Sequence, residues 1–165
     1  MLVGASSSSA ARRSRGFTLI ELIVTITVAA VLAGLALPAF QNFIANQRVR
    51  NASFDLMAAL MLTRNQAVTR NTEVSFVKKS TDTWDAGWTV TVDTTTVLLK
   101  QEPFNNLAIT DSAGLSTITY GRDGRSSTAG TQFTVGPATT NSAVSPRCIT
   151  ISPSGLPSSR LGACS

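Results

Sequence analysis

The first pattern along the chain is a long apolar run close to its N-terminus. From Leu22 to Phe40 every residue is apolar, glycine, proline or threonine, and the next charged residue is Arg48. A helix of about 19 such residues spans a hydrocarbon core of roughly 30 Å. The pattern therefore predicts a helix whose first half lies in a membrane or against neighbouring subunits.

Beyond Pro38 the helical pattern continues but becomes amphipathic. Apolar residues recur at steps of three, four or seven, and Arg48, Asn51 and Asp55 fall outside their stripe. The stripe consists of Val49, Ala52, Leu56, Ala59, Leu60 and Ala67. A continuous helix over residues 17–70 would be roughly 80 Å long. Pro38 lacks a backbone N–H, so we expect a bend or local melting there.

After Asn71 the pattern changes to the alternation that is typical of β-strands. The candidate strands are short and are separated by glycine, proline, aspartate, asparagine or serine. They span residues 72–77, 87–92, 97–101, 116–120, 132–135 and 148–151. The expected fold is α+β, with an antiparallel sheet assembly packed on the amphipathic half of the helix.

Positive charge is concentrated before the apolar run. Arg12, Arg13 and Arg15 precede it, which predicts a cytoplasmic N-terminus and an exported part after Phe40. The net charge is +5. Without these three arginines it would be about +2, so the basic balance alone does not indicate a nucleic-acid partner.

The boundary between this basic leader and the helix differs from that of a secretory signal peptide. Such a peptide has a shorter apolar stretch that precedes its cleavage site, whereas here Gly16 stands before the apolar helix. Cleavage after Gly16 would remove the arginines and keep the helix. Glu21 then remains as a single carboxylate near the start of the run, where membrane insertion costs roughly 2.5–3.5 kcal/mol.

The hexapeptide Gly-Phe-Thr-Leu-Ile-Glu at residues 16–21 resembles the processing site of type IV pilins and type II secretion pseudopilins. The resemblance implies cleavage by prepilin peptidase between Gly16 and Phe17, N-methylation of Phe17, and a helix-kinking role for Pro38. The new ammonium at Phe17 would be available to pair with Glu21 of a neighbouring subunit. Glu21 is therefore expected to be an assembly contact.

Later segments are similar, in order, to those of one branch of this superfamily, the GspH/FimT-like minor pilins and pseudopilins. They are MLTRNQAVTRNTEVSF (residues 61–76), WDAGW (84–88), ITYGRDGRSS (118–127) and CITISPSG (148–155). The resemblance implies a type IV pilin-like fold. Its parts would be a cleaved leader (1–16), a transmembrane or filament-core helix (17–40), an amphipathic half (41–70) and a globular domain (71–165).

The function that the resemblance implies is that of a FimT/FimU-like minor pilin in the tip or priming complex of a type IV pilus. Its partners would be other major and minor pilins, prepilin peptidase and the assembly platform. It would cross the bacterial inner membrane once, with the globular domain in the periplasm, and then join the filament at the cell surface. The alternative is a minor pseudopilin of a type II secretion system.

Residues for catalysis or metal binding form no motif. The chain has no histidine, its nine acidic residues are scattered, and it contains neither G-x-S-x-G nor a phosphate-binding loop. We expect no enzyme activity, cofactor or metal site. Cys148 and Cys164 would pair in an oxidising compartment, the alternative being two buried free thiols. Trp84 and Trp88 are expected to anchor the core, with ligand stacking as the alternative.

A DNA receptor for natural transformation is a further alternative. After Tyr120 the chain carries Arg122, Arg125, Arg147 and Arg160 but a single acid, and arginine binds the phosphate backbone without reading sequence. Some FimT-like pilins bind DNA through a C-terminal G-R-x-R motif. The segment GLPSSR before Leu161 departs from that motif, and a solvated turn and tail would also explain these arginines.

Overall fold

The computed structural model describes residues 16–79, 83–93 and 95–165. The expected leader, with its three arginines, therefore lies outside the described residues except for Gly16. The chain divides into two compact units, one that ends at Ala39 and one that comprises residues 40–165.

The first unit is the N-terminal part of helix α1, which spans Leu19–Arg70. Every large apolar side chain of this part is exposed, from 45% at Ile23 to 75% at Leu35. By length and composition this stretch could cross a membrane. The helix continues through residue 38. The bend expected at Pro38 stays a prediction.

The rest of α1 belongs to the second unit and packs on the β-strands. All six residues of the predicted apolar stripe are buried, with exposed fractions of 1% or less. Arg48, Asn51 and Asp55 are exposed. Two hydroxyls on the buried face are satisfied within the helix, since Ser53 donates to the Val49 carbonyl and Thr63 to that of Ala59. The predicted amphipathic helix is confirmed.

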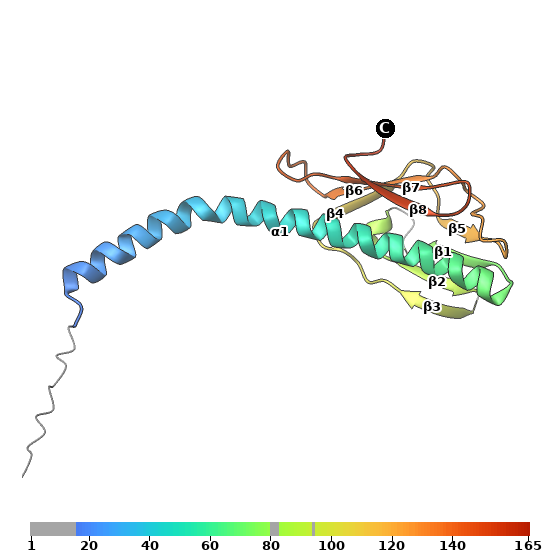
Figure 1. Ribbon diagram of the computed structural model, residues 1–165, viewed down its shortest axis with the longest axis horizontal. Coiled ribbons are helices and arrows are strands. Elements are labelled where there is room, and N and C mark those ends of the chain that lie inside the picture. Colours follow the sequence, from blue (N-terminus) through green and yellow to red (C-terminus); the bar gives the residue numbers. More distant parts are fainter. Residues whose placement is uncertain (1–15, 80–82, 94) are drawn as a thin grey trace, which may run out of the picture. The chain divides into compact units, whose positions relative to one another are not determined.

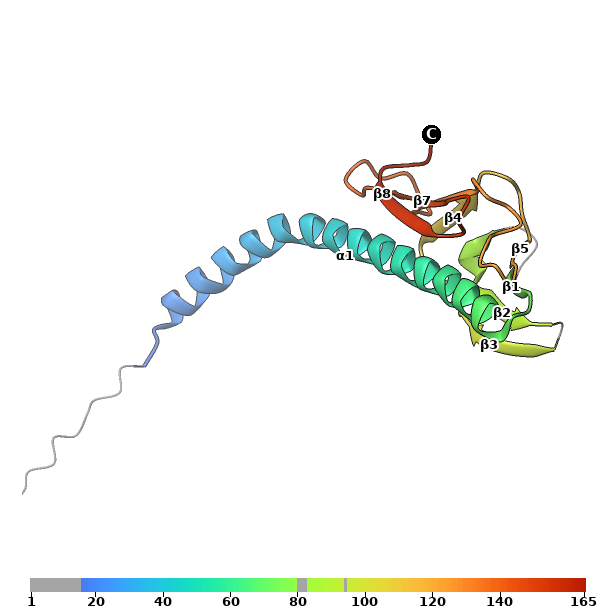
Figure 2. The same ribbon diagram turned by 45° about the vertical axis from the view of Figure 1, so that its right-hand side comes forward.

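Within the described residues, eight strands form two four-stranded antiparallel sheets that lie along the second part of α1 (Figures 1 and 2). The first sheet has the order β3-β2-β1-β5 and contains β1 (Val74–Lys78), β2 (Trp88–Val92), β3 (Thr96–Lys100) and β5 (Thr117–Tyr120). The second has the order β4-β6-β7-β8 and contains β4 (Leu107–Asp111), β6 (Gln132–Pro137), β7 (Arg147–Ile151) and β8 (Pro157–Leu161). The α+β fold class is confirmed, but β4 and β8 were not predicted.

Aromatic rings fill the core between the helix and the sheets. Trp84, in a 3-10 turn over Trp84–Ala86, stacks on Phe76 with 4.9 Å between ring centroids. It also meets Phe133 of β6 edge to face. Trp84 and Trp88 are both fully buried. The two tryptophans therefore anchor the core, as expected, and present no ring for ligand stacking.

Candidate functional site

The start of α1 holds the residues expected to govern processing. Gly16 and Phe17 precede the helix, Phe17 is 80% exposed, and a Cβ built on Gly16 would meet nothing within 4 Å. Exposed, non-helical backbone suits a protease substrate. Cleavage and methylation at this junction remain predictions.

Thr18 caps the helix, a role that the sequence analysis missed. Its Oγ1 accepts a hydrogen bond from the backbone N–H of Glu21 at 3.3 Å, and its carbonyl accepts one from Leu22 at 3.2 Å. Thr18 and Glu21 have the T-x-x-E spacing of a capping box. A carboxylate in the first turn also interacts favourably with the partial positive charge at the N-terminus of the helix. Glu21 therefore also stabilises its own helix, and the spacing alone would have revealed this.

The polar groups inside the apolar run are satisfied locally. The hydroxyls of Thr25 and Thr27 each donate over 2.8 Å to a carbonyl of the preceding turn, Leu22 and Ile23 respectively. A threonine bonded in this way presents its methyl group outward without an unpaired donor. This surface is therefore suited to lipid or to neighbouring apolar helices.

The predicted disulfide is confirmed. Cys148 of β7 is bonded to Cys164 of the C-terminal tail. The tail is further held by a hydrogen bond from the backbone N–H of Cys164 to Oγ1 of Thr134, on β6. Cys148 lies opposite Thr134 and Arg160 in the ladder, so the tail crosses one face of the second sheet.

The four arginines considered for DNA binding lie in different places. Arg122 and Arg125 belong to one turn, in which Asp123 accepts a hydrogen bond from the Arg125 backbone. Arg147 pairs with Leu161 and Arg160 with Cys148, one position apart in the ladder. Since neighbouring positions face opposite ways, Arg147 and Arg160 lie on opposite faces of the sheet. The structure does not gather the four into one patch, and DNA binding stays a prediction.

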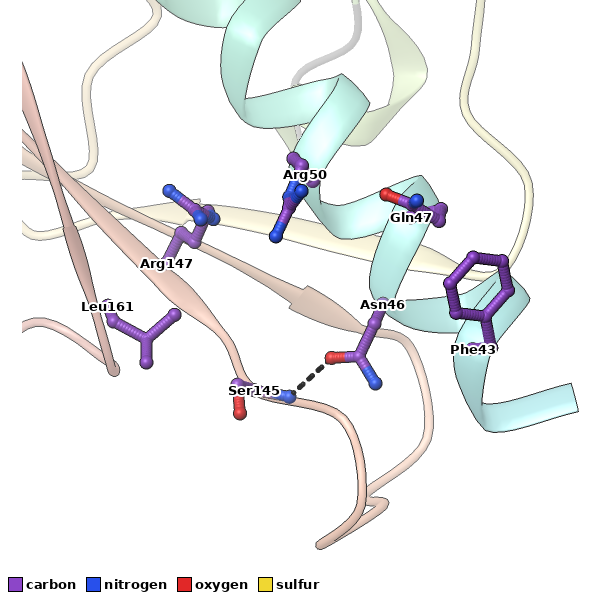
Figure 3. A pocket seen from close by; sticks show the side chains of 7 residues that line it. All are labelled: Phe43, Asn46, Gln47, Arg50, Ser145, Arg147 and Leu161. Atoms are coloured by element: carbon purple, nitrogen blue, oxygen red, sulfur yellow. Dashed lines mark hydrogen bonds between the residues drawn. The ribbon is translucent and has the colours of Figure 1, made fainter. Parts of the chain in front are cut away.

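A hollow of about 190 Å³ lies between α1, the start of β7 and the end of β8. Figure 3 shows its lining, which consists of Phe43, Asn46, Gln47, Arg50, Ser145, Arg147 and Leu161. Asn46 fixes one wall, because its Oδ1 accepts from the Ser145 backbone at 3.0 Å and its Nδ2 donates to the Ala143 carbonyl at 2.9 Å. Sequence reasoning selected Arg147 but missed Arg50, since nothing local to residue 50 places it beside β7.

Comparison with known families identifies the chain. Residues 52–155 match the family described as Type II transport protein GspH, and residues 11–37 match the prokaryotic N-terminal methylation motif. The chain belongs to the GspH family. The predicted membership of the GspH/FimT-like branch is confirmed at the level of the family.

Two solved structures share the GspH fold of the chain. The type IV minor pilin FimU of Pseudomonas aeruginosa has a TM-score of 0.60 at 19% identity, over 67% of this chain and 91% of FimU. The minor pseudopilin EpsH of the Vibrio cholerae type II secretion system has a TM-score of 0.51 at 12% identity, over 70% of this chain and 97% of EpsH. At these identities the likeness shows the fold alone.

Sequence relatives of this GspH-family chain match shorter segments. A fimbrial protein of Moraxella nonliquefaciens is 50% identical over 38 residues, which are 23% of this chain and 25% of that protein. The type IV major alpha-pilin of Moraxella bovis is 43% identical over 44 residues, which are 27% of this chain and 28% of that pilin. The chain thus spans about a quarter of the length of these curated relatives.

Proposed function

We propose that this chain is a minor pilin of a type IV pilus, a filament subunit that prepilin peptidase cleaves between Gly16 and Phe17 and methylates at Phe17. The observation that carries the proposal is the first part of α1. Its large apolar side chains are all exposed, it contains a single carboxylate, Glu21, and it lies within the matched methylation motif. Such a surface needs a membrane before assembly and neighbouring helices afterwards.

Each segment of the chain has its own proposed role. Residues 1–16 are the removed leader, residues 17–40 form the membrane anchor and then the filament core, and residues 41–70 join this core to the globular domain of residues 71–165. The N-terminus faces the cytoplasm and the globular domain faces the periplasm of the inner membrane. Prepilin peptidase, the assembly platform, and other major and minor pilins are the partners.

A second candidate function is that of a minor pseudopilin in type II secretion. The name of the matched family and the likeness to EpsH favour it. The sequence matches to a fimbrial protein and to a type IV major alpha-pilin of Moraxella support the pilus. Deletion of the gene distinguishes the two, because loss of surface pili with normal protein export supports the pilus, and loss of export with normal pili supports the pseudopilus.

Mass spectrometry of the N-terminus tests the processing step. We expect an N-methylated Phe17 as the first residue in cells that contain prepilin peptidase, and an intact leader in cells that lack it. A Gly16→Val variant serves as the control, since its branched side chain should block cleavage and keep the leader. A mature protein that begins elsewhere, or an unprocessed chain in peptidase-containing cells, would contradict the proposal.

A further inference from the structure

The hollow between α1 and β7 brings two cations together. Arg50 comes from the helix and Arg147 from the strand, and both side chains border the same space (Figure 3). The lining contains no carboxylate. Two guanidinium groups at one hollow repel each other unless an anion lies between them.

Neither arginine is neutralised by the described part of the chain. The ion pairs found there join Lys79 and Lys100 to Glu102, and Arg125 to Asp123. Arg147 makes only a long hydrogen bond, 3.5 Å from Nη1 to Oγ of Ser159. The donors of both guanidinium groups are therefore available to an external anion, and this fork geometry suits phosphate oxygens.

The hollow lies just beyond the end of the apolar run. Phe43, on its lining, follows Phe40 by three residues, which is about 4.5 Å along a helix. Arg50 follows Phe40 by about 15 Å, but helical side chains lean toward the N-terminus, so its guanidinium lies nearer to Phe40 than its backbone does. Lipid headgroups extend roughly 5–8 Å beyond each side of the hydrocarbon core. If residues 17–40 span the membrane as proposed, Phe43 falls within the headgroup layer and the side chain of Arg50 leans toward this layer along the helix.

The rim of the hollow carries exposed apolar side chains. The rings of Phe40 and Phe43 stack with centroids 6.5 Å apart, and they are 61% and 56% exposed. Leu161, on the opposite rim, is 67% exposed. Exposed aromatic and aliphatic groups beside arginines are typical of surfaces that lie in a membrane interface.

We propose that this hollow binds the phosphate of an anionic phospholipid headgroup through Arg50 and Arg147, with Phe43 and Leu161 against the lipid. The proposal rests on the membrane placement in the proposed function. Asn46 makes the site rigid before binding, because it bonds the 143–145 backbone to α1. The headgroup would stay bound until the subunit leaves the membrane for the filament.

Native mass spectrometry of the full chain tests this site. The chain is released from nanodiscs that contain phosphatidylglycerol and phosphatidylcholine in equal amounts, and the lipids that stay bound are counted. We expect the wild type to retain phosphatidylglycerol at least about tenfold over phosphatidylcholine. Arg50→Gln with Arg147→Gln should abolish this preference. Arg122→Gln with Arg125→Gln, which removes the same charge elsewhere, should retain it.

Each other outcome overturns a defined part of the inference. Equal enrichment in all three proteins, or its loss in both double variants, removes the site and leaves the membrane anchor intact. A chain that does not enter nanodiscs contradicts the proposed function itself. If inorganic phosphate added in detergent raises the melting temperature as much as phosphatidylglycerol does, the ligand is free phosphate and not lipid.

Two further measurements separate the lipid from a protein occupant and from misfolding. Cross-linking to other pilins that falls in the Arg50/Arg147 variant while its lipid preference persists assigns the hollow to a neighbour's carboxylate and overturns the lipid proposal. Circular dichroism melting checks that the variant is folded. If it is not, Arg50→Lys with Arg147→Lys, which keeps the charges but not the forks, should reduce the preference without abolishing it.

Discussion

The indole of Trp84 donates a hydrogen bond from Nε1 to Oδ1 of Asp111 over 3.1 Å. The other oxygen of the same carboxylate accepts the backbone N–H groups of Ala113 and Leu115, at 3.2 and 2.7 Å. Asp111 ends β4, so one side chain joins a fully buried aromatic ring of the core to the connection that leads to β5. Because β4 belongs to the second sheet and β5 to the first, this carboxylate stabilises the connection between the two sheets.

Replacing Asp111 should destabilise the globular unit. In Asp111→Ala three hydrogen bonds disappear and the buried Trp84 donor is left unpaired, so we expect a loss of about 2–4 kcal/mol in the free energy of unfolding. Urea unfolding of the full chain in detergent, followed by near-UV circular dichroism, measures it. Thr110→Ala, at an exposed neighbouring position, is the matched control. Equal effects of the two substitutions would refute this role of Asp111.

Gly155 is expected to tolerate no side chain. Its φ is +80°, and a Cβ there would overlap the Gly124 carbonyl oxygen and lie 3.0 Å from Cε1 of Tyr120. We expect Gly155→Ala to lower the free energy of unfolding by about 2–4 kcal/mol. Thermal unfolding measures this loss as a lower midpoint temperature. Gly114→Ala provides the control, since its φ is +64° but nothing lies within 4 Å. The control should lose only about 1 kcal/mol, and similar losses at both sites would argue against the close contact.

Tyr120 should make stability fall at alkaline pH. Burial raises the pKa of its phenol to about 12, from an ordinary value of 10, although the Arg64 charge opposes the shift. The folded state favours the neutral phenol, so its contribution is complete below pH 10 and is lost as the pH rises from 10 to 12. One pKa unit corresponds to 1.36 kcal/mol, and the loss should reach about 2–3 kcal/mol.

The Tyr120→Phe variant isolates this effect from the titration of lysines. The Tyr120 hydroxyl is buried and has no hydrogen-bond partner among the described residues, so its removal should not destabilise the protein at pH 7. Unfolding free energies of the two proteins are compared at several values between pH 8 and 12. The difference between them should change by about 2–3 kcal/mol across this range. Parallel curves would show that Tyr120 does not titrate as proposed.

Glu21→Ala should reduce entry into filaments without preventing membrane insertion. Removal of one partner of a buried ion pair costs about 3–5 kcal/mol, which predicts at least about a tenfold lower ratio of sheared-filament to membrane-bound subunit. Immunoblotting of the two fractions gives this ratio. Thr18→Ala tests the capping role alone, because it removes the cap and keeps the carboxylate. Wild-type incorporation of Glu21→Ala, or an equal defect in Thr18→Ala, would exclude intersubunit pairing.

Much of the fold could be predicted because its patterns are local. The apolar stripe from Val49 to Ala67 and the alternation of the central strands each report burial directly. β8 could not be predicted, since Pro-Ser-Ser-Arg-Leu has the composition of a turn and becomes a strand only through its pairing with β7. β4 differs from β8, because Leu107 and Ile109 are buried and alternate with less buried neighbours, so its local pattern could have predicted it.

The candidate site shows the same division between local and distant information. The Gly16–Glu21 signature and the two cysteines are read directly from the sequence, and the disulfide is present. That Arg50 and Arg147 line the same hollow cannot be read from the sequence, because 97 positions along the chain separate them. Only the packing of β7 beside α1 brings them together. The Thr18 cap is also local information, because the T-x-x-E spacing of Thr18 and Glu21 is enough to predict it.

The Cys148–Cys164 bond also determines how this subunit would respond to mechanical tension. The bond closes a loop with a sequence separation of 16, which would otherwise contribute about 55 Å of extended chain. A force that pulls on α1 and on the C-terminus cannot extend this segment while the bond is intact. β7 and β8 are therefore kept within reach of each other even in a stretched chain, and the hairpin that they form is available to refold as soon as the load is released.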